Sequence, residues 1–299
     1  MLVRSRSGGR SQQNSDLEER ILSHIEEDPT MSTRQIATME GVSHTTVWRT
    51  LKDQQMHPYH YQRVQQLEEG DPERRRNFCS WMLQKLRENE NFISQILFTD
   101  EAGFDRSGVF NLHNEHVWAI ENPHAVVERH SQRQFSCNVW AGIVNETLIG
   151  PVILPNRLTG QYYLDFLQNE LPELLADVPL STRRDMWYMH DGAPPHSTTA
   201  VTNHLNSTFG EKWIGRRGPV PWPARSPDLN PLDFFFWGHF KTLVYSTPVN
   251  TLEDLVLRIQ FTAGIIKNVT GDFKKVNDNF RKRIQLCLEQ DGGHFEHLL

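Results

Sequence analysis

Three aspartates occupy positions that suit metal-dependent chemistry. Asp100 comes directly after the apolar run at residues 96–99, and Asp191 follows a second apolar run at residues 186–189. Asp233 falls in the first turn of a predicted helix, where backbone dipoles favour a carboxylate. Oxygen ligands without an accompanying cysteine favour Mg²⁺ or Mn²⁺ over zinc. We therefore predict that Asp100, Asp191 and Asp233 are catalytic and metal-binding residues.

Three carboxylates can hold two such ions, and paired ions suit phosphodiester chemistry. One ion activates the attacking water or 3′-hydroxyl, while the other stabilises the leaving oxygen of an in-line displacement. The predicted cofactors are thus two Mg²⁺ (or Mn²⁺) ions per active site. The predicted substrate class is nucleic acid.

Each aspartate taken singly also has a purely structural interpretation. An aspartate after a strand is a common turn former. Asp233 could simply be a helix-capping acid, since Asn230 suits the cap position and Pro231 the first helical position. The residue types alone leave these alternatives open.

Neighbouring polar residues are candidates for auxiliary roles. His190 and His196 flank Asp191 and could contact phosphate or a metal-bound water, although packing or turn roles suit them equally well. Asn230 is a third auxiliary candidate. Glu101 points to the opposite face from Asp100 if the strand continues, so we do not count it as a ligand.

The elements that must position these acids follow an α/β pattern. Apolar runs predict strands at residues 96–99, 109–112, 117–120, 139–144, 147–149 and 186–189, with a hairpin turn at 145–146. Helical patterns cover residues 161–175 and 198–205, and the chain after Asp233 is mainly helical. Strands followed by alternating helix and strand indicate a mixed sheet flanked by helices.

The N-terminal region predicts three short helices. The first opens at a capping box at Ser15 and ends before Pro29. The second begins at a capping box at Ser32, presents Ile36 and Met39 as its apolar face, and ends at Gly41.

The third helix is capped by Ser43 and turns residues 47 and 51 inward. This plan predicts a helix-turn-helix, whose last helix enters the major groove. A small helical bundle without a ligand is the alternative. The candidate DNA-binding residues are Ser43, His44, Thr45, Arg49 and Lys52, together with Arg4, Arg6 and Arg10 of a predicted flexible basic arm.

Composition limits the classes of protein that remain. The 299 residues suit one large and one small domain, and 37% hydrophobic residues describe a folded protein. Three dispersed cysteines predict neither disulfides nor a thiolate zinc site, which favours the cytosol or nucleus. We expect no membrane insertion. Because the net charge is −6, DNA binding must come from local basic patches.

Three segments, considered together, resemble the catalytic motifs of mariner-superfamily transposases. They are LFTDEAGF at 97–104, HDGAPPH at 190–196 and WPARSPDLNPLD at 222–233. The family places its third acid two residues after Asn-Pro, which selects Asp233 rather than Asp228. Between Asp191 and Asp233 lie 41 residues, and we expect the extra length to form a loop at 209–223.

The resemblance implies an RNase H-like catalytic domain with the first acid on the first strand and the second after the fourth strand. We expect a basic arm at 1–14, a helix-turn-helix domain at 15–60, a helical linker at 61–92, the catalytic domain at 93–245 and C-terminal helices packed on it at 246–299. Family members usually have two helix-turn-helix units, and we expect the first to be missing here.

The implied function is that of a nuclear transposase. It would cut double-stranded DNA at the terminal repeats of an element and transfer the freed 3′-hydroxyl into target DNA, acting as a homodimer in the synaptic complex. The main alternative is a transposase-derived DNA-binding protein without catalytic activity. An RNase H-like nuclease acting on RNA or hybrids is a second alternative, which the helix-turn-helix disfavours because that module binds grooves of duplex DNA.

Overall fold

The computed structural model of the chain describes residues 8–58, 64–106, 135–267 and 272–299. The chain divides into two units, Met1–Gln62 and Arg63–Leu299, and each has its own hydrophobic core. None of the helices in the described ranges has the length and apolar character needed to span a membrane.

The first unit consists of three helices, α1 (Gly8–Glu27), α2 (Thr33–Glu40) and α3 (His44–Asp53). One fully buried side chain from each helix, Ile21, Ile36 and Val47, meets in its core. On the surface, the carboxylate of Glu40 accepts hydrogen bonds from Arg20 at 2.7 Å and His24 at 2.8 Å, which fastens α2 to α1.

The ends of α2 and α3 form as their sequence predicts. Ser32 and Gln35 make the reciprocal hydrogen bonds of a capping box. Gly41 ends α2 in the left-handed conformation at a φ of 66°, which glycine adopts without steric cost. The hydroxyl of Ser43 then accepts from the backbone N–H of Thr46 at 3.1 Å and caps α3.

Two features of the first unit differ from expectation. Helix α1 begins at Gly8. The predicted flexible arm is therefore wrong for residues 8–14, and the helix does not start at the predicted Ser15 cap. A formed helix extends through polar residues at little cost, and their lack of apolar side chains therefore did not exclude it. Met39 is 62% exposed, because Ile36 and Ala37 already fill the inner side of α2.

The second unit is built on a five-stranded mixed sheet of order β3-β2-β1-β4-β5. Its strands are β1 (Ile96–Asp105), β2 (Ser136–Val144), β3 (Thr147–Leu154), β4 (Trp187–Met189) and β5 (Trp213–Ile214). β1, β2 and β3 form an antiparallel meander, whereas β1 pairs with β4, and β4 with β5, in parallel. Asn145 turns the predicted β2–β3 hairpin with a φ of 55°.

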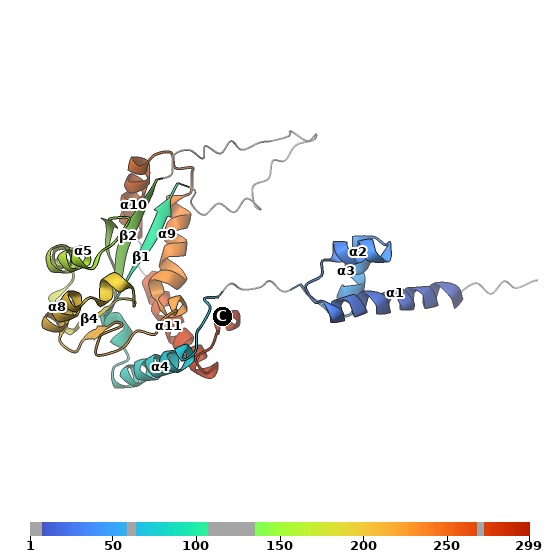
Figure 1. Cartoon of the computed structure of the whole chain (residues 1–299), viewed down its shortest axis with the longest axis horizontal. Helices are drawn as coiled ribbons and strands as arrows, with labels where there is room; N and C mark the ends of the chain where they lie inside the picture. The colour runs from blue at the N-terminus through green and yellow to red at the C-terminus, as the bar shows by residue number, and fades with distance from the viewer. Residues whose placement is uncertain (1–7, 59–63, 107–134, 268–271) are drawn as a thin grey trace, which may run out of the picture. The chain divides into compact units, whose positions relative to one another are not determined.

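Helices cover both faces of the sheet (Figure 1). One face carries α5 (Gly160–Asp165), the π-helical turn η3 (Phe166–Glu170), α6 (Leu171–Leu174) and α8 (Thr199–Phe209), whose apolar side chains cluster with Leu97 and Trp140. The other face carries α4 (Asp71–Glu88), α9 (Trp237–Val244), α10 (Leu252–Lys267) and α11 (Asp272–Glu289), which cluster with Phe98 and Ala102. Side chains of β1 alternate between these two cores, as a strand requires.

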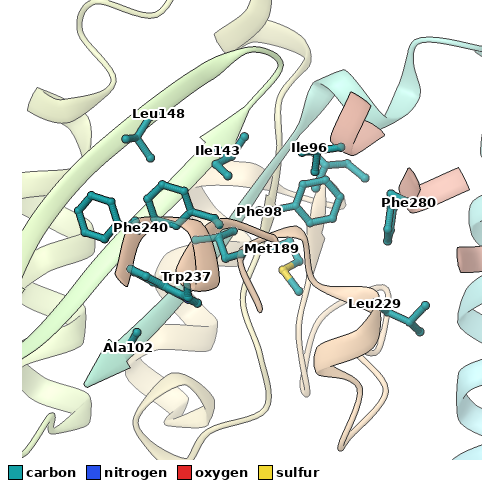
Figure 2. Packing of buried hydrophobic residues seen from close by; sticks show 14 of the residues in the cluster. Ile96, Phe98, Ala102, Ile143, Leu148, Met189, Leu229, Trp237, Phe240 and Phe280 are labelled. Carbon is teal, nitrogen blue, oxygen red and sulfur yellow. The ribbon is translucent and has the colours of Figure 1, made fainter. Parts of the chain in front are cut away.

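Aromatic residues fill the second core (Figure 2). Phe98 of β1 meets Phe280 of α11 edge to face, with ring centroids 5.2 Å apart, and Trp237 and Phe240 of α9 are both buried there. Trp237 and Phe240 also meet Phe104 of β1, so large aromatic side chains pack α9 against this strand. This packing holds the segment that begins at the third predicted acid against the strand that carries the first.

Helix α4 and the C-terminal helices belong to the same core. Phe78 and Met82 of α4 lie in the cluster that also contains Phe280 and Ile284 of α11. Residues 63–92 of the predicted helical linker at 61–92 belong to the second compact unit, which begins at Arg63.

Two expectations for the second unit need correction or fall outside the described residues. The predicted loop at 209–223 contains β5, in which Trp213 pairs with Tyr188 of β4. A two-residue strand has no periodicity to detect, and only its pairing with β4 defines it. The predicted strands at 109–112 and 117–120 lie outside the described residues.

Candidate active site

Asp100 lies in the middle of the sheet rather than at a strand end. β1 continues past it to Asp105, and Asp100 stands opposite Ala141 of β2. The strand predicted at 96–99 is therefore too short, because pairing with β2 extends it through Asp100 to Asp105. The indole N–H of Trp237, on α9, donates a hydrogen bond to Oδ2 of Asp100 at 2.8 Å and fixes one carboxylate oxygen.

Asp233 is delivered by the start of the helical segment that leads into α9. Asn230 accepts a hydrogen bond from the backbone N–H of Leu232 at 3.2 Å, and its carbonyl accepts from Phe234 N–H at 3.0 Å. The helix then opens with a π-helical turn, η6 (Leu232–Phe236), before α9. Asn230 is thus a cap, as predicted, and it sets where Asp233 stands.

Asp100 and Asp233 lie on two elements in contact, β1 and η6, and other acids affect the pKa of both. Burial, together with the charges of Asp233 and Glu101, raises the pKa of Asp100 well above its usual value. Although Asp233 is exposed to solvent, desolvation by the surrounding protein and the charge of Asp191 raise its pKa to about 6. Crowded carboxylates resist losing their protons, and a cation between them relieves this repulsion.

Asp191 follows β4 and is held through one oxygen. Its Oδ1 accepts hydrogen bonds from the backbone N–H of Ala193 at 2.9 Å and from Nδ1 of His196 at 2.7 Å. Burial alone would raise the pKa of Asp191, but these two bonds and the His196 charge lower it below its usual value. Asp191 is therefore ionised at neutral pH.

His190 and His196 are both buried, and neither is directed at solvent as a phosphate contact would be. Their rings stack 5.0 Å apart at 11°, and Nδ1 of His190 lies 3.1 Å from the hydroxyl of Tyr163. Burial lowers the pKa of His190 well below its usual value. Burial opposes protonation of His196 too, but the charges of Glu101 and Asp191 outweigh it and raise its pKa to about 10.

Asp228, the rejected alternative for the third acid, has a different role. It is buried and accepts two hydrogen bonds from the guanidinium of Arg75 on α4, at 2.7 and 2.6 Å. Arg75 also donates to the hydroxyl of Ser226 and the carbonyl of Gly292. This bidentate ion pair uses both carboxylate oxygens of Asp228, so they are not directed at a metal site.

Sequence reasoning missed two residues of this site. Trp237 contacts Asp100 directly, and Glu101 approaches His196 with Oε1 3.3 Å from Nε2. Glu101 does face away from Asp100, as expected, but it thereby faces the histidine that holds Asp191. Its alternation with Asp100 along β1 was the signal that could have identified this position.

The carboxylate oxygens of the three aspartates are ligands of the type that hard divalent cations such as Mg²⁺ prefer. Asp100, Asp191 and Asp233 act on one another electrostatically. The charged side chains that most affect the pKa of Asp100 and of Asp233 are other acids. Within the described residues, no three His, Cys, Asp or Glu side chains stand in a ready-made metal cage. Asp191 and Asp100 each have one oxygen engaged by His196 or Trp237, which leaves the other oxygen of each for a ligand.

The predicted DNA-binding residues of α3 form an exposed face. His44, Thr45, Arg49 and Lys52 are all exposed, whereas Ser43 is committed to its capping bond. Sequence reasoning missed Trp48, which is 48% exposed with Nζ of Lys52 4.8 Å from its ring centroid. Arg4 and Arg6 lie outside the described residues, as does the side chain of Arg10.

Sequence comparison finds relatives for both parts of the chain. A family model described as winged helix-turn-helix DNA-binding matches residues 15–53. The human histone-lysine N-methyltransferase SETMAR is 23% identical over 97% of this chain and 41% of its own length. The Tc3 transposase of Caenorhabditis elegans is 27% identical over 66% of this chain and 54% of its own length. The chain thus spans about half the length of the curated relatives it matches.

Solved structures share the fold. The mariner Mos1 paired end complex with Mg matches 99% of this chain and 84% of its own with a TM-score of 0.76 at 20% identity. A pre-cleavage Mos1 transpososome matches with a TM-score of 0.74 at 18% identity, over 99% of this chain and 83% of its own. The catalytic domain of Mos1 mariner transposase matches 79% of this chain and 100% of its own with a TM-score of 0.57 at 20% identity.

These matches confirm the predicted fold class, a helix-turn-helix domain followed by an RNase H-like mixed sheet with helices. The chain is a homologue of SETMAR and of Tc3 transposase with the fold of Mos1 mariner transposase, so that the resemblance to mariner-superfamily transposases is confirmed.

Proposed function

We propose that this chain is a transposase that cuts DNA strands at transposon ends and joins the freed 3′-hydroxyl to target DNA. The observation that carries the proposal is that neighbouring elements bear the three acids. The strand β1, with Asp100, pairs in parallel with β4, which ends two residues before Asp191, and β1 contacts η6, which bears Asp233. Burial and the charges of other acids raise the pKa of Asp100 and of Asp233, which marks a candidate site for metal-dependent phosphodiester chemistry.

The relatives support this choice of substrate. Tc3 is named as a transposase, and the Mos1 structures include a paired-end complex with left transposon end and a strand transfer complex. Other Mos1 complexes are described with Mn or with Mg. Double-stranded DNA and a divalent metal are therefore the partner and cofactor that we assign to this chain.

In the proposed site, Asp100, Asp191 and Asp233 would hold two Mg²⁺ or Mn²⁺ ions. When bound, the metal supplies activation of the attacking oxygen and stabilisation of the leaving oxygen. The protein's own contribution is orientation. Trp237 fixes one oxygen of Asp100, and His196 with the Ala193 N–H fixes one oxygen of Asp191. Asn230 sets the helix start that presents Asp233.

DNA recognition is assigned to the first unit. His44, Thr45 and Arg49 would face base edges from α3, with Lys52 beside them as a phosphate contact. Arg4, Arg6 and Arg10 would follow the backbone or minor groove as a basic arm. The proposed enzyme acts in the nucleus as a homodimer, because two element ends must be brought together for joining.

A cleavage assay tests this function. Purified full-length chain is incubated with linear DNA that carries the inverted repeats flanking its gene, with Mg²⁺, beside the matched variant Asp191→Asn. We expect wild-type chain to nick the DNA at the repeat ends and the variant to bind the same DNA without cutting it.

The alternatives give different results in the same assay. Equal binding with no cleavage above the variant's level would overturn the enzyme and support a DNA-binding protein derived from a transposase. Cleavage of an RNA–DNA hybrid in preference to the duplex would instead indicate an RNase H-like nuclease.

A further inference from the structure

The neighbours Asp100 and Glu101 face opposite sides of the same strand. Asp100 points to the side where Trp237 of α9 binds it. Glu101 points to the side of α5 and is 14% exposed in its side chain. From that side Glu101 contacts His196, which in turn hydrogen-bonds Asp191.

His196 bridges Glu101 and Asp191 with its two ring nitrogens. Nδ1 lies 2.7 Å from Oδ1 of Asp191, and an ionised carboxylate can only accept, so Nδ1 donates. Nε2 lies 3.3 Å from Oε1 of Glu101. Nε2 of His196 and Oε1 of Glu101 are both buried, and among the described residues neither has a hydrogen-bond partner of good geometry. Their 3.3 Å ion-pair contact is therefore the polar contact that the structure gives to both atoms.

The ring of His196 has little freedom to turn. It is 2% exposed, its centroid lies 4.2 Å from that of Tyr163, and it stacks on His190 at 5.0 Å. Tyr163 is itself fixed by a 2.7 Å hydrogen bond with the hydroxyl of Tyr188. Because the His196 ring is held between Tyr163 and His190, the position of Glu101 at Nε2 affects the position of Asp191 at Nδ1.

Asp191 is the residue that receives this constraint. With the Ala193 N–H and His196 both on Oδ1, the second oxygen is left for a ligand in a defined direction. We propose that Glu101 is a positioning residue that acts through His196 to orient Asp191 for metal binding. The inference rests on the proposed function, since it assigns a metal to Asp191. A carboxylate behind a histidine commonly tunes a metal ligand in this way.

Mn²⁺ binding to the full chain tests the proposal without any cleavage step. The dissociation constant is measured by titration calorimetry and by the loss of the free-ion electron paramagnetic resonance signal. We expect Glu101→Gln, which keeps the size and removes the charge, to weaken Mn²⁺ binding about 10- to 100-fold. Glu101→Asp keeps the charge on a shorter side chain, and we expect an intermediate affinity.

A double-mutant cycle shows whether Glu101 acts through His196. His196→Asn can still donate from a position close to Nδ1 but has no second nitrogen to meet Glu101. We expect Glu101→Gln to cause no further loss of Mn²⁺ affinity in the His196→Asn background, because the connection is already broken. An additive loss would show that Glu101 acts on the metal by another route and would overturn the inference.

Matched controls separate a structural effect from a positioning effect. Asp254→Asn, like Glu101→Gln, keeps the size of an acid of the second unit and removes its charge, but Asp254 pairs with Arg258 on α10 at 2.8 Å, and the variant should bind Mn²⁺ like wild type. Thermal unfolding of every variant is recorded without metal. If Asp254→Asn weakens Mn²⁺ binding as much as Glu101→Gln does, the effect is general loosening and the proposal fails.

Failure of the inference and failure of the proposed function give different titrations. If Asp191→Asn abolishes the site while Glu101→Gln leaves the dissociation constant unchanged, the metal site stands and the role of Glu101 does not. If Asp191→Asn binds Mn²⁺ as wild type does, the acids do not form a metal site and both fail together.

Discussion

At the residue scale, Asp228 and Asp233 belong to one motif but have opposite electrostatic surroundings. Asp228 is buried and neutralised by the guanidinium of Arg75. Asp233 stands near the other acids, and its pKa is raised to about 6. An acid whose charge is compensated stabilises the fold, whereas an acid crowded by like charges costs stability until a cation arrives.

This contrast predicts stability changes of opposite sign in metal-free buffer at pH 7. Asp228→Ala leaves Arg75 buried without its partner, and we expect it to lower the free energy of unfolding by about 3–5 kcal/mol. Asp233→Asn removes a charge that the folded state disfavours, and we expect unchanged or higher stability. Urea unfolding followed by tryptophan fluorescence measures both.

The pH dependence has a defined sign for Asp233. Because its pKa rises from an ordinary value of 3.8 to about 6 on folding, the folded state binds the proton more tightly. The contribution of this group to stability is therefore present below pH 3.8 and is lost as the pH rises through about 6. Any advantage of Asp233→Asn should grow over that range, and a variant less stable than wild type at pH 7 would contradict this.

At the element scale, the start of α4 is tied to the segment that carries the third motif. Asp71, the first residue of α4, is fully buried and accepts hydrogen bonds from Arg74 at 2.6 Å and from Nη2 of Arg225 at 3.0 Å. The hydrogen bonds from Arg225, only partly opposed by burial, hold the pKa of Asp71 well below its usual range. This contact spans distant parts of the sequence and fixes the approach to Asn230.

We predict that Asp71→Asn destabilises the second unit more at neutral pH than in acid. A carboxyl whose pKa is lowered on folding contributes its full stability above its ordinary pKa of 3.8, and that contribution decreases progressively as the pH falls from there towards the lowered pKa of the folded state. The difference in free energy of unfolding between wild type and variant should thus shrink from pH 7 to pH 3. Urea unfolding at several pH values measures it, and a constant difference would exclude the ion pair as its source.

At the scale of the whole molecule, the net negative charge opposes contact with a polyanion, so the proposed DNA binding requires a local basic surface. The net charge is −6, while α3 exposes Arg49 and Lys52 on one face beside His44 and Thr45. Contacts to phosphate release counterions and make affinity depend on salt, whereas contacts to base edges give sequence preference.

We predict that the two basic residues of α3 differ in the assay. Lys52→Ala should weaken binding to repeat and unrelated DNA alike and reduce the slope of log affinity against log salt by about 1. Arg49→Ala should weaken binding to repeat DNA more than to unrelated DNA. Fluorescence anisotropy between about 50 and 200 mM salt measures both, with Lys85→Ala as control because Lys85 on α4 is paired with Glu88. Equal losses for Lys52→Ala and the control would refute the DNA-binding face.

The sequence by itself determined the local elements and the candidate acids. Ser32, Gly41 and Ser43 act within a few residues of themselves, so their caps could be predicted. The choice of Asp233 over Asp228 rested on the family motif that residues 222–233 resemble. The helical start at Gly8 and the short strand β5 were missed, since neither is specified by an apolar pattern of its own.

Only the tertiary structure decided how the acids are held and what surrounds them. Pairing with β2 extends β1 beyond Asp100. Packing of α9 brings the Trp237 indole to the carboxylate of Asp100. Arg75 hydrogen-bonds both carboxylate oxygens of Asp228. The positioning role proposed for Glu101 depends on its contact with His196, a residue distant in sequence. The physical reason is that hydrogen-bond partners, burial and electrostatic neighbours come from contacts between segments far apart in the chain, whereas caps, turns and periodicity depend on near neighbours.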